Sequence, residues 1–188
     1  MSRRPLQLSL LLALAACAGA DEPGADEMIA PLFDVKTGAQ GFHASASGEE
    51  EVPPRPTNAV GNATFSLSDD GTELRYKLSV ANIENVVQAH IHLAPVGVNG
   101  NIVAFLYGLV ASGGGRVDGV LAEGTITAAD LLNDLAGMTI ADLVAAIKAG
   151  NTYVNVHTND GVGAINTGPG DFPGGEVRGQ IGGGHTRH

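Results

Sequence analysis

Strict alternation of apolar and polar side chains is the feature that most constrains what this chain can fold into. Between residues 61 and 80 every second position is apolar, in two runs that are separated by Asp69, Asp70 and Gly71. A period of two residues is typical of a strand with one buried and one wet face. Because Asp-Gly marks a tight turn, the two runs predict an antiparallel hairpin. The apolar positions are Ala63, Phe65, Leu67, Leu74, Tyr76, Leu78 and Val80.

Five further segments have strand-like composition, and one region has helical spacing. Strands are predicted over residues 86–93, 102–107, 119–127, 153–158 and 175–181. Two short helices are predicted over 128–135 and 140–149, since each follows a threonine with an aspartate three residues later, the pattern of a capping box. A parallel α/β fold would need helices between most strands. The pattern therefore predicts a mainly β fold, an antiparallel Greek-key-like β-sandwich with a short helical pair inserted between late strands.

The amino terminus resembles an export signal. Two arginines precede an apolar run over residues 6–16, which is too short to remain in a bilayer as a spanning helix. The run ends in Leu14-Ala15-Ala16-Cys17, which looks like a bacterial lipobox, and Cys17 is the single cysteine of the chain. We therefore predict a lipoprotein signal peptide at 1–16 and lipidation of Cys17, which anchors the chain in the lipid bilayer. An ordinary cleaved signal with an incidental cysteine is the alternative.

These features also predict where the protein resides and how it is divided. Ala18 rather than Asp follows Cys17, so we expect a cell envelope lipoprotein, periplasm-facing or at the surface, at the outer membrane if the organism has one. Residues 17–40 are predicted to be the acylated cysteine and a flexible linker, 41–182 one domain, and 183–188 a disordered tail.

Charge and cysteine content exclude several classes of protein. The chain has 188 residues with 10 Lys and Arg against 20 Asp and Glu, a formal net charge of −10. Proteins that bind nucleic acid concentrate cationic side chains on one surface, so a nucleic-acid partner is not expected. One cysteine excludes an internal disulfide and any zinc or iron–sulfur site built from several cysteines.

A His-x-His pair is the strongest candidate for a chemical site. Strand alternation places His90 and His92 on one face of segment 86–93, and His157 lies on segment 153–158. If the two strands are neighbours, the three imidazoles offer nitrogen ligands that suit copper or zinc. Two other interpretations remain open at this point: ordinary surface or hydrogen-bonded structural histidines, and acid–base catalysis. His43, His185 and His188 are interpreted as surface or tail residues.

Four further residues form a supporting polar cluster in this prediction. Asn155 shares a strand face with His157, and Glu176 shares one with Arg178. An acid such as Glu176 or Glu51 would orient a histidine ring or occupy a fourth ligand position. We expect Arg178 to form an ion pair or donate to a carbonyl. The run Glu49-Glu50-Glu51 is interpreted as solvated charge, with calcium or partner binding as the alternative.

Familiar catalytic motifs are absent from the sequence. There is no Gly-x-Ser-x-Gly elbow, and Gly113-Gly114-Gly115 is followed by Arg116 rather than by a Gly-Lys-Ser/Thr phosphate-binding sequence. No catalytic residues and no nucleotide cofactor are predicted, and we expect the protein not to be an enzyme.

Four separated phrases carry a family resemblance. FHASASGEEEVPP, ATFSLSDDGTELRYKLSVANIENVVQAHIHLAPVGVNGNIVAFLY, TYVNVHT and GGEVRGQI resemble, in order and spacing, the CHRD domain, named from chordin and found in many exported bacterial proteins. The resemblance spans about residues 41–182. His43 departs from the small or polar residue that the family has there. The matching positions are Glu51, Pro53, Pro54, His90, His92, Asn155, His157, Gly175, Glu176, Arg178 and Gly179.

The resemblance implies a role in binding. In chordin the domain stands in a protein that binds growth factors outside the cell, but a shared domain does not transfer that partner. The resemblance implies a non-enzymatic, envelope-anchored binding or interaction module with an unknown protein or surface partner. The alternative, from the histidines, is an extracytoplasmic metal-binding domain that takes copper or zinc.

Overall fold

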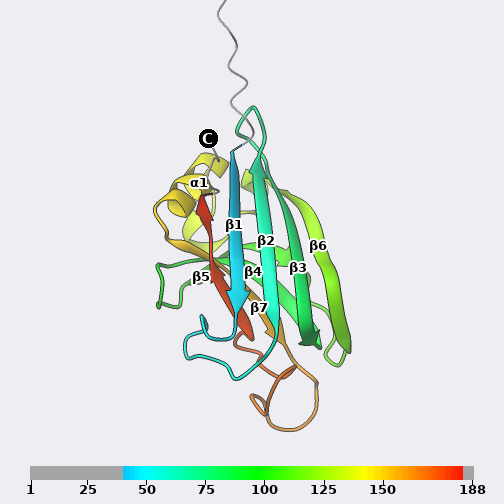
Figure 1. Ribbon diagram of the computed structural model, residues 1–188. Coiled ribbons are helices and arrows are strands. Elements are labelled where there is room, and N and C mark those ends of the chain that lie inside the picture. The colour runs from blue at the N-terminus through cyan, green and yellow to red at the C-terminus, as the bar shows by residue number, and fades with distance from the viewer. Residues whose placement is uncertain (1–39, 184–188) are drawn as a thin grey trace, which may run out of the picture. The chain divides into compact units, whose positions relative to one another are not determined.

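One antiparallel sheet accounts for the strands of residues 40–183, the part of the chain that the computed structural model describes (Figure 1). The predicted signal peptide, Cys17, the linker up to residue 39 and the tail from residue 184 lie outside the described residues. Within 40–183 no helix is long and apolar enough to cross a membrane. The strands are β1 (Gly41–Ser47), β2 (Val60–Leu67), β3 (Leu74–Glu84), β4 (Val86–Leu93), β5 (Asn101–Tyr107), β6 (Arg116–Ile126), β7 (Thr152–Thr158), β8 (Val177–Gln180) and β9 (Gly182–Gly183).

The strand order β5-β4-β7-β8-β1-β2-β3-β6 makes the sheet almost closed. Figure 1 shows β1, β2, β3 and β6 side by side, with β4, β5 and β7 behind them. The short strand β8 joins these two halves, and β9 pairs with β1. At the other edge β5 contacts β6, and the Tyr76 hydroxyl donates a 2.7 Å hydrogen bond to the Leu106 carbonyl. The mainly β, antiparallel prediction is confirmed, whereas the sandwich and the Greek key are not, because the strands form one continuous sheet.

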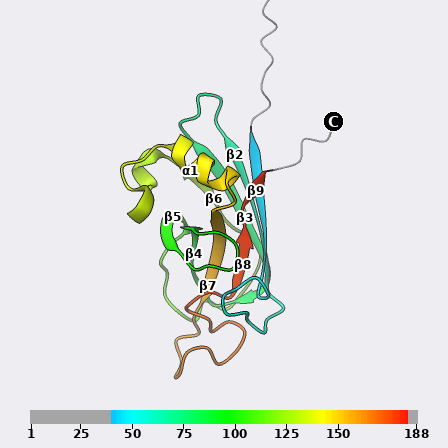
Figure 2. The ribbon, with the colours of Figure 1, turned by 90° about the vertical axis from the view of Figure 1, so that its left-hand side faces the viewer.

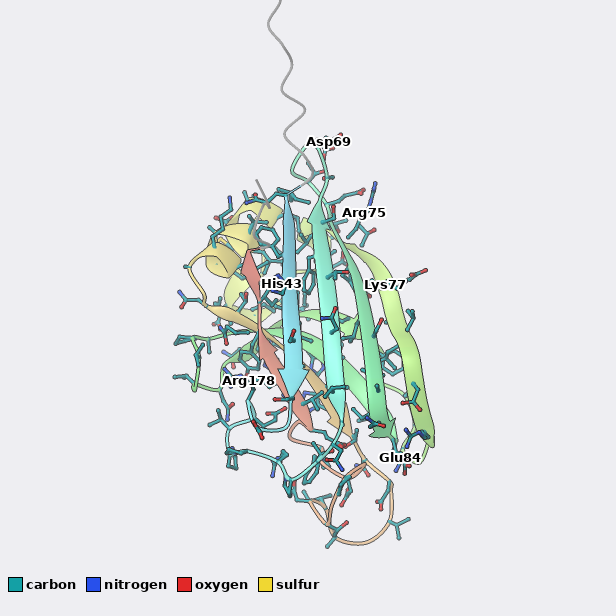
Figure 3. The ribbon with its side chains drawn as sticks, in the orientation of Figure 1. His43, Asp69, Arg75, Lys77, Glu84 and Arg178 are labelled. Carbon is teal, nitrogen blue, oxygen red and sulfur yellow. The ribbon has the colours of Figure 1, made fainter. Side chains whose placement is uncertain are left out.

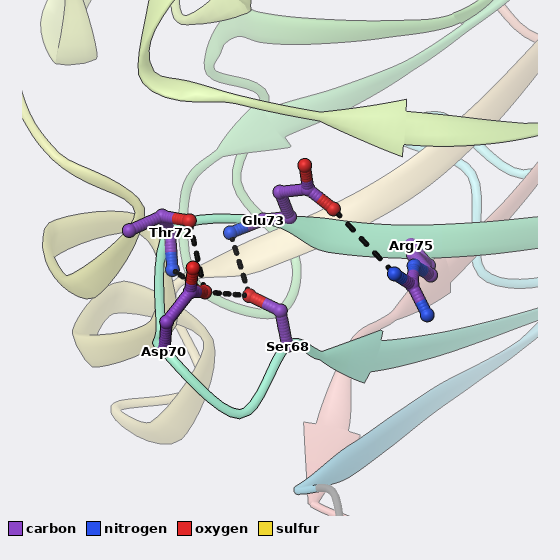
Figure 4. Close-up of polar contacts among 5 residues, drawn as sticks. All are labelled: Ser68, Asp70, Thr72, Glu73 and Arg75. Carbon is purple, nitrogen blue, oxygen red and sulfur yellow. Dashed lines mark hydrogen bonds and ion pairs between the residues drawn. The ribbon is translucent and has the colours of Figure 1, made fainter.

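The predicted hairpin is formed by β2 and β3. Phe65 pairs with Tyr76 and Ala63 with Leu78 on the inner face, while the alternate residues Arg75 and Lys77 are exposed (Figure 3). The turn is held by Asp70, whose carboxylate accepts hydrogen bonds from the hydroxyls of Ser68 and Thr72 and from the Thr72 amide (Figure 4). These donors lower the pKa of Asp70 to about 2.

The predicted helical pair is half correct. Helix α1 (Ile140–Lys148) begins at the expected Thr139–Asp142 capping box and buries Ile140, Leu143, Val144 and Ile147. Residues 128–135 instead form two single turns of 3-10 helix, η1 (Ala128–Asp130) and η2 (Asn133–Leu135). An α-helix stops there because Leu131 is extended and buried and Asn133 has a left-handed backbone with φ 47°.

Alternation along β4 and β7 gives the sheet two chemically different faces. Ala89 and Ile91 of β4, with Val154 and Val156 of β7, are buried in the hydrophobic core. The residues between them, His90 and His92 on β4 and Tyr153, Asn155 and His157 on β7, therefore lie on the opposite face. On the neighbouring strand β5, whose residues 102–107 form an apolar run, Phe105 is 44% exposed. The sheet thus turns a row of polar and aromatic groups away from its core.

Candidate metal centre

Pairing of β4 with β7 brings His90, His92 and His157 together. In the register of this pair His90 faces Asn155, His92 faces Tyr153, and Gln88 faces His157. The ring centroid of His90 lies 5.5 Å from that of His92 and 4.9 Å from that of His157. One nitrogen from each ring lies within 4.8 Å of the others. The adjacency that the sequence could only assume is present in the structure.

Three loops cover this face of the sheet. Residues 48–59 and 159–176 lie at the same end of the sheet in both ribbon views, and residues 94–100 cross beside them (Figure 2). Asn99 donates to the Val52 carbonyl and Arg55 to the Gly175 carbonyl, so the loops are bonded to one another. As a result His90 is fully buried, and His92 and His157 are 8% and 7% exposed. The histidines lie opposite the core, as expected, but they are not on an open surface.

Two backbone carbonyls fix the proton positions of two rings. His92 Nδ1 lies 2.9 Å from the Gly100 carbonyl oxygen, and His157 Nδ1 lies 2.8 Å from that of Pro173. Because a carbonyl only accepts, each Nδ1 carries the proton and each Nε2 keeps a lone pair. Both Nε2 atoms are buried without a partner, as are both nitrogens of His90. The face therefore collects imidazole nitrogens that no protein group among the described residues engages.

The three rings are uncharged at neutral pH. Burial, together with the neighbouring histidines, lowers the pKa of His90 to about 3 and that of His157 to about 4. Burial also lowers the pKa of His92, with a further contribution from the positive charge of Arg178. Neutral imidazole is the form that binds a metal ion, so protons compete weakly for these nitrogens.

The donor set fits a transition metal ion. Zinc and copper accept three imidazole nitrogens at about 2.0–2.1 Å, which places the nitrogens about 3.4 Å apart in a tetrahedral arrangement. The nitrogens found here, within 4.8 Å of one another, would have to move closer together on binding an ion. Structural metal histidines commonly donate their second N–H to a carbonyl, as His92 and His157 do. Within residues 40–183, this is the one group of three His, Cys, Asp or Glu residues with ligand atoms so close.

Arg178 holds the loop beside His92 rather than forming an ion pair. Its guanidinium donates to the carbonyls of Pro95 and Val98 and to the side chain of Asn99. It also lies 3.5 Å from the Tyr153 ring centroid, and Tyr153 stacks on His92 at 4.7 Å and 6°. The arginine is buried on β8 (Figure 3), so the predicted carbonyl donor fixes the 94–100 loop and, through Tyr153, packs the His92 ring.

The two candidate acids lie in different surroundings. Glu51 accepts a 2.6 Å hydrogen bond from Asn155 Nδ2, and burial raises the Glu51 pKa to about 7 against the opposing charges of Arg178 and Arg55. The Glu176 carboxylate instead accepts from Thr57, Thr158 and the Gly170 amide, which ties the loops together. Both acids therefore bond to β7, but Glu51 bonds to Asn155 on the face that carries the histidines, whereas Glu176 bonds to Thr158 and braces the covering loops.

Sequence reasoning missed three participants. Tyr153 stands two residues before Asn155 and four before His157, so alternation alone places it on the same face. The carbonyls of Gly100 and Pro173 contribute backbone atoms, and no side-chain pattern signals them. His43 lies on β1, exposed and away from this group (Figure 3).

Stability of the metal-free protein is expected to fall as the pH drops from about 6.5 to about 4.5. In the unfolded chain imidazoles bind protons below about pH 6.5. In the folded protein the pKa of His90 is about 3 and that of His157 about 4, so between these pH values the unfolded chain binds more protons and acid favours unfolding. Glu51 acts in the opposite direction, because burial raises its pKa in the folded protein to about 7, above the ordinary value of 4.5 that it has in the unfolded chain. Glu51→Gln should therefore steepen the loss of stability. Urea unfolding at several pH values, in a buffer that contains a chelator, measures the free energy of unfolding of both proteins as a function of pH.

The matched control for this pH dependence is Glu50→Gln, which changes the exposed neighbour. It should retain the wild-type slope. Equal slopes in wild type and Glu51→Gln would show that the buried carboxyl does not hold a proton in the folded state.

Gly175→Ala should destabilise the protein by about 1–3 kcal/mol. A Cβ there would collide with Asn155 Nδ2 and Glu51 Oε1, and the backbone has φ +119°. Gly182→Ala is the control, since no atom lies within 4 Å of its Cβ position, and it should change stability by less than about 0.5 kcal/mol. Urea unfolding of both variants checks this, and equal midpoints would contradict the close packing of Glu51 against Asn155.

Comparison with known proteins gives the family. No curated protein sequence matches the chain. The family model of the CHRD domain matches residues 42–181, a span that contains β1 to β8, the covering loops and the three histidines. The chain therefore belongs to the CHRD domain family.

Proposed function

We propose that this protein is an extracytoplasmic metal-binding module that holds one copper or zinc ion between His90, His92 and His157. The observation that carries the proposal is the convergence of buried imidazole nitrogens, one from each ring, within 4.8 Å and without protein partners. A buried polar atom without a hydrogen bond costs about 1–3 kcal/mol, and a bound cation would satisfy three at once.

The competing interpretations of these histidines are less well supported. Surface histidines would be hydrated, but His90 is fully buried. Histidines with a purely structural role would use their ring nitrogens on protein groups, yet His90 uses neither and the other two rings each leave Nε2 free. Donation to the Pro173 carbonyl gives His157 a structural role as well, and that bond is compatible with ligation through Nε2.

The burial of the donors supports binding in preference to catalysis, since His90, His92 and His157 are at most 8% exposed and give an external substrate little access. Nitrogen sites bind copper more tightly than zinc. Within residues 40–183, no second group of three His, Cys, Asp or Glu residues has its ligand atoms so close together. We therefore propose a non-enzymatic role in which the module binds or carries the ion.

Partner binding through loops is a second candidate function. Leu109, Val162 and Ile165 are 78%, 74% and 61% exposed. They lie on two loops that are bonded to each other, because the Gly113 amide donates to the Asn159 carbonyl. Exposed apolar side chains on neighbouring loops favour contact with a protein or another surface. This candidate agrees with the interaction role that the family implies, and it is compatible with a metal ion on β4 and β7.

Location in the cell envelope is also part of the proposal. The basic start, the apolar run and Cys17 at the lipobox position support a lipid anchor, although they lie outside the described residues. A metal site on an anchored domain would face the space outside the cytoplasm, at the outer membrane if the organism has one.

The full-length protein in detergent is expected to bind one equivalent of Cu²⁺ or Zn²⁺. His92→Ala and His157→Ala should each weaken binding of the ion at least about 100-fold, because each removes one of the three protein ligands. His43→Ala is the matched control and should bind as wild type, since His43 is exposed on β1. Elemental analysis with competition titration measures this. Binding by wild type no stronger than by a variant lacking all three histidines would refute the site.

Cys17→Ser should release the protein from membranes, because the thiol is the atom that lipidation would modify. Detergent phase partitioning of cells that express either form measures the change, with wild type in the detergent phase and the variant in the aqueous phase. Retention of the variant with the membrane would argue against anchoring by acylation.

A further inference from the structure

Unpartnered polar atoms are concentrated around the proposed metal site. Of seven buried side-chain atoms without a hydrogen-bond partner in residues 40–183, five belong to His90, His92, His157 and Asn155. One metal ion would engage one nitrogen of each histidine. Two atoms are then left over: the second nitrogen of His90 and Oδ1 of Asn155.

These two atoms belong to directly opposed residues. His90 and Asn155 are register partners on β4 and β7, and their side chains project from the same face. Residues opposed in this way have Cβ atoms about 4.5–5.5 Å apart, close enough for their side chains to interact. A residue whose ring N–H lacks an acceptor is therefore paired with a residue whose amide oxygen lacks a donor, although the two groups do not hydrogen-bond in this structure.

His90 is the exception among the three rings. His92 and His157 each have a backbone carbonyl that fixes the ring proton at Nδ1, whereas His90 has none. A metal-bound histidine needs such an acceptor to hold its tautomer and ring orientation. Asn155 Oδ1 is the unused acceptor on the facing residue.

Glu51 determines which end of the Asn155 amide is available. The amide nitrogen donates a 2.6 Å hydrogen bond to Glu51 Oε1, and since an amide NH2 can only donate, this Glu51 oxygen is the acceptor whether or not the other oxygen carries a proton. Oδ1 must then be the free end. Glu51 is 4% exposed, and its approach to Asn155 requires the missing side chain of Gly175.

We infer that Glu51, Asn155 and His90 form a relay in which Asn155 Oδ1 accepts the ring N–H of His90 while the other His90 nitrogen binds the metal ion. The inference rests on the proposed function. Asn155 and Glu51 are positioning residues: Glu51 fixes the orientation of the Asn155 amide, and Asn155 holds one tautomer and one ring orientation of His90.

The test compares Zn²⁺ affinity of the full-length protein across four variants. Asn155→Ala and Glu51→Ala should each weaken binding about 10- to 100-fold while keeping one ion per chain. Glu51→Gln retains an oxygen that accepts from Asn155 and should bind within about threefold of wild type. Thr152→Val is the matched control: this buried hydroxyl on β7 has no partner and lies on the core face, so its loss should not change affinity.

A second measurement separates positioning from general loss of structure. Nitrogen-15 NMR of the His90 ring should show one tautomer in wild type and in Glu51→Gln, and a mixture in Asn155→Ala and Glu51→Ala. Should Asn155→Ala not fold, the two Glu51 variants give the same comparison. Lower thermal stability alone, with unchanged affinity and unchanged tautomer, would overturn the relay.

The possible failures are distinguishable. If wild type binds one Zn²⁺ and all four variants bind equally well, the relay is wrong and the metal site remains. If wild type binds no Zn²⁺ or Cu²⁺, the proposed function is wrong, and the relay is wrong with it.

Discussion

Closure of three loops over the polar face of β4, β7 and β8 is the constraint on which the candidate site depends. A sheet with one apolar face normally leaves the other to water. Here the second face is buried as well, under loops that Arg178, Asn99 and Glu176 bind to the strands and to each other. Without this cover the imidazoles would be hydrated, and burial would no longer lower their pKa values. Because the loops cover this face, the histidines that strand alternation places on it become a buried set of nitrogen donors.

The cover and the ligands are connected by a short chain of contacts. The Gly100 amide donates to the Tyr153 hydroxyl, and the Gly100 carbonyl accepts from His92. Tyr153 lies between His92 and the Arg178 guanidinium, which in turn holds the loop that contains Gly100. Each member of this ring of contacts fixes the next, so the orientation of His92 is set by residues of three strands and one loop.

Local features of the fold were predictable from the sequence. The hairpin of β2 and β3 and the start of α1 follow from alternation and from a capping box, which act over a few residues. The first predicted helix is wrong because burial of Leu131 and the left-handed Asn133 interrupt it, and these depend on tertiary packing. Whether strands form one sheet or two depends on β8, whose pairing with both β7 and β1 has no local signal.

The candidate site was also predictable only in part, because its local features follow from the sequence and its long-range contacts do not. Alternation gives the faces of His90, His92, Asn155 and His157, but their adjacency requires pairing of strands about sixty residues apart. Which acid lies near the histidines depends on the path of the loop that carries Glu51. The lipid anchor at Cys17 remains a prediction.

The four residues of β8 each complete a different part of the molecule. Val177 enters the core, Arg178 fastens the 94–100 loop, Gly179 fits closely against β1, and Gln180 donates to the carbonyls of Ala94 and Gly150. All four lie near the carboxyl end of the chain. Because β8 follows β1 to β7 in the chain, a nascent chain that extends only as far as β7 has neither a joined sheet nor the residues that hold the 94–100 loop over the histidines. Burial of the three imidazoles is therefore one of the last steps in forming this fold.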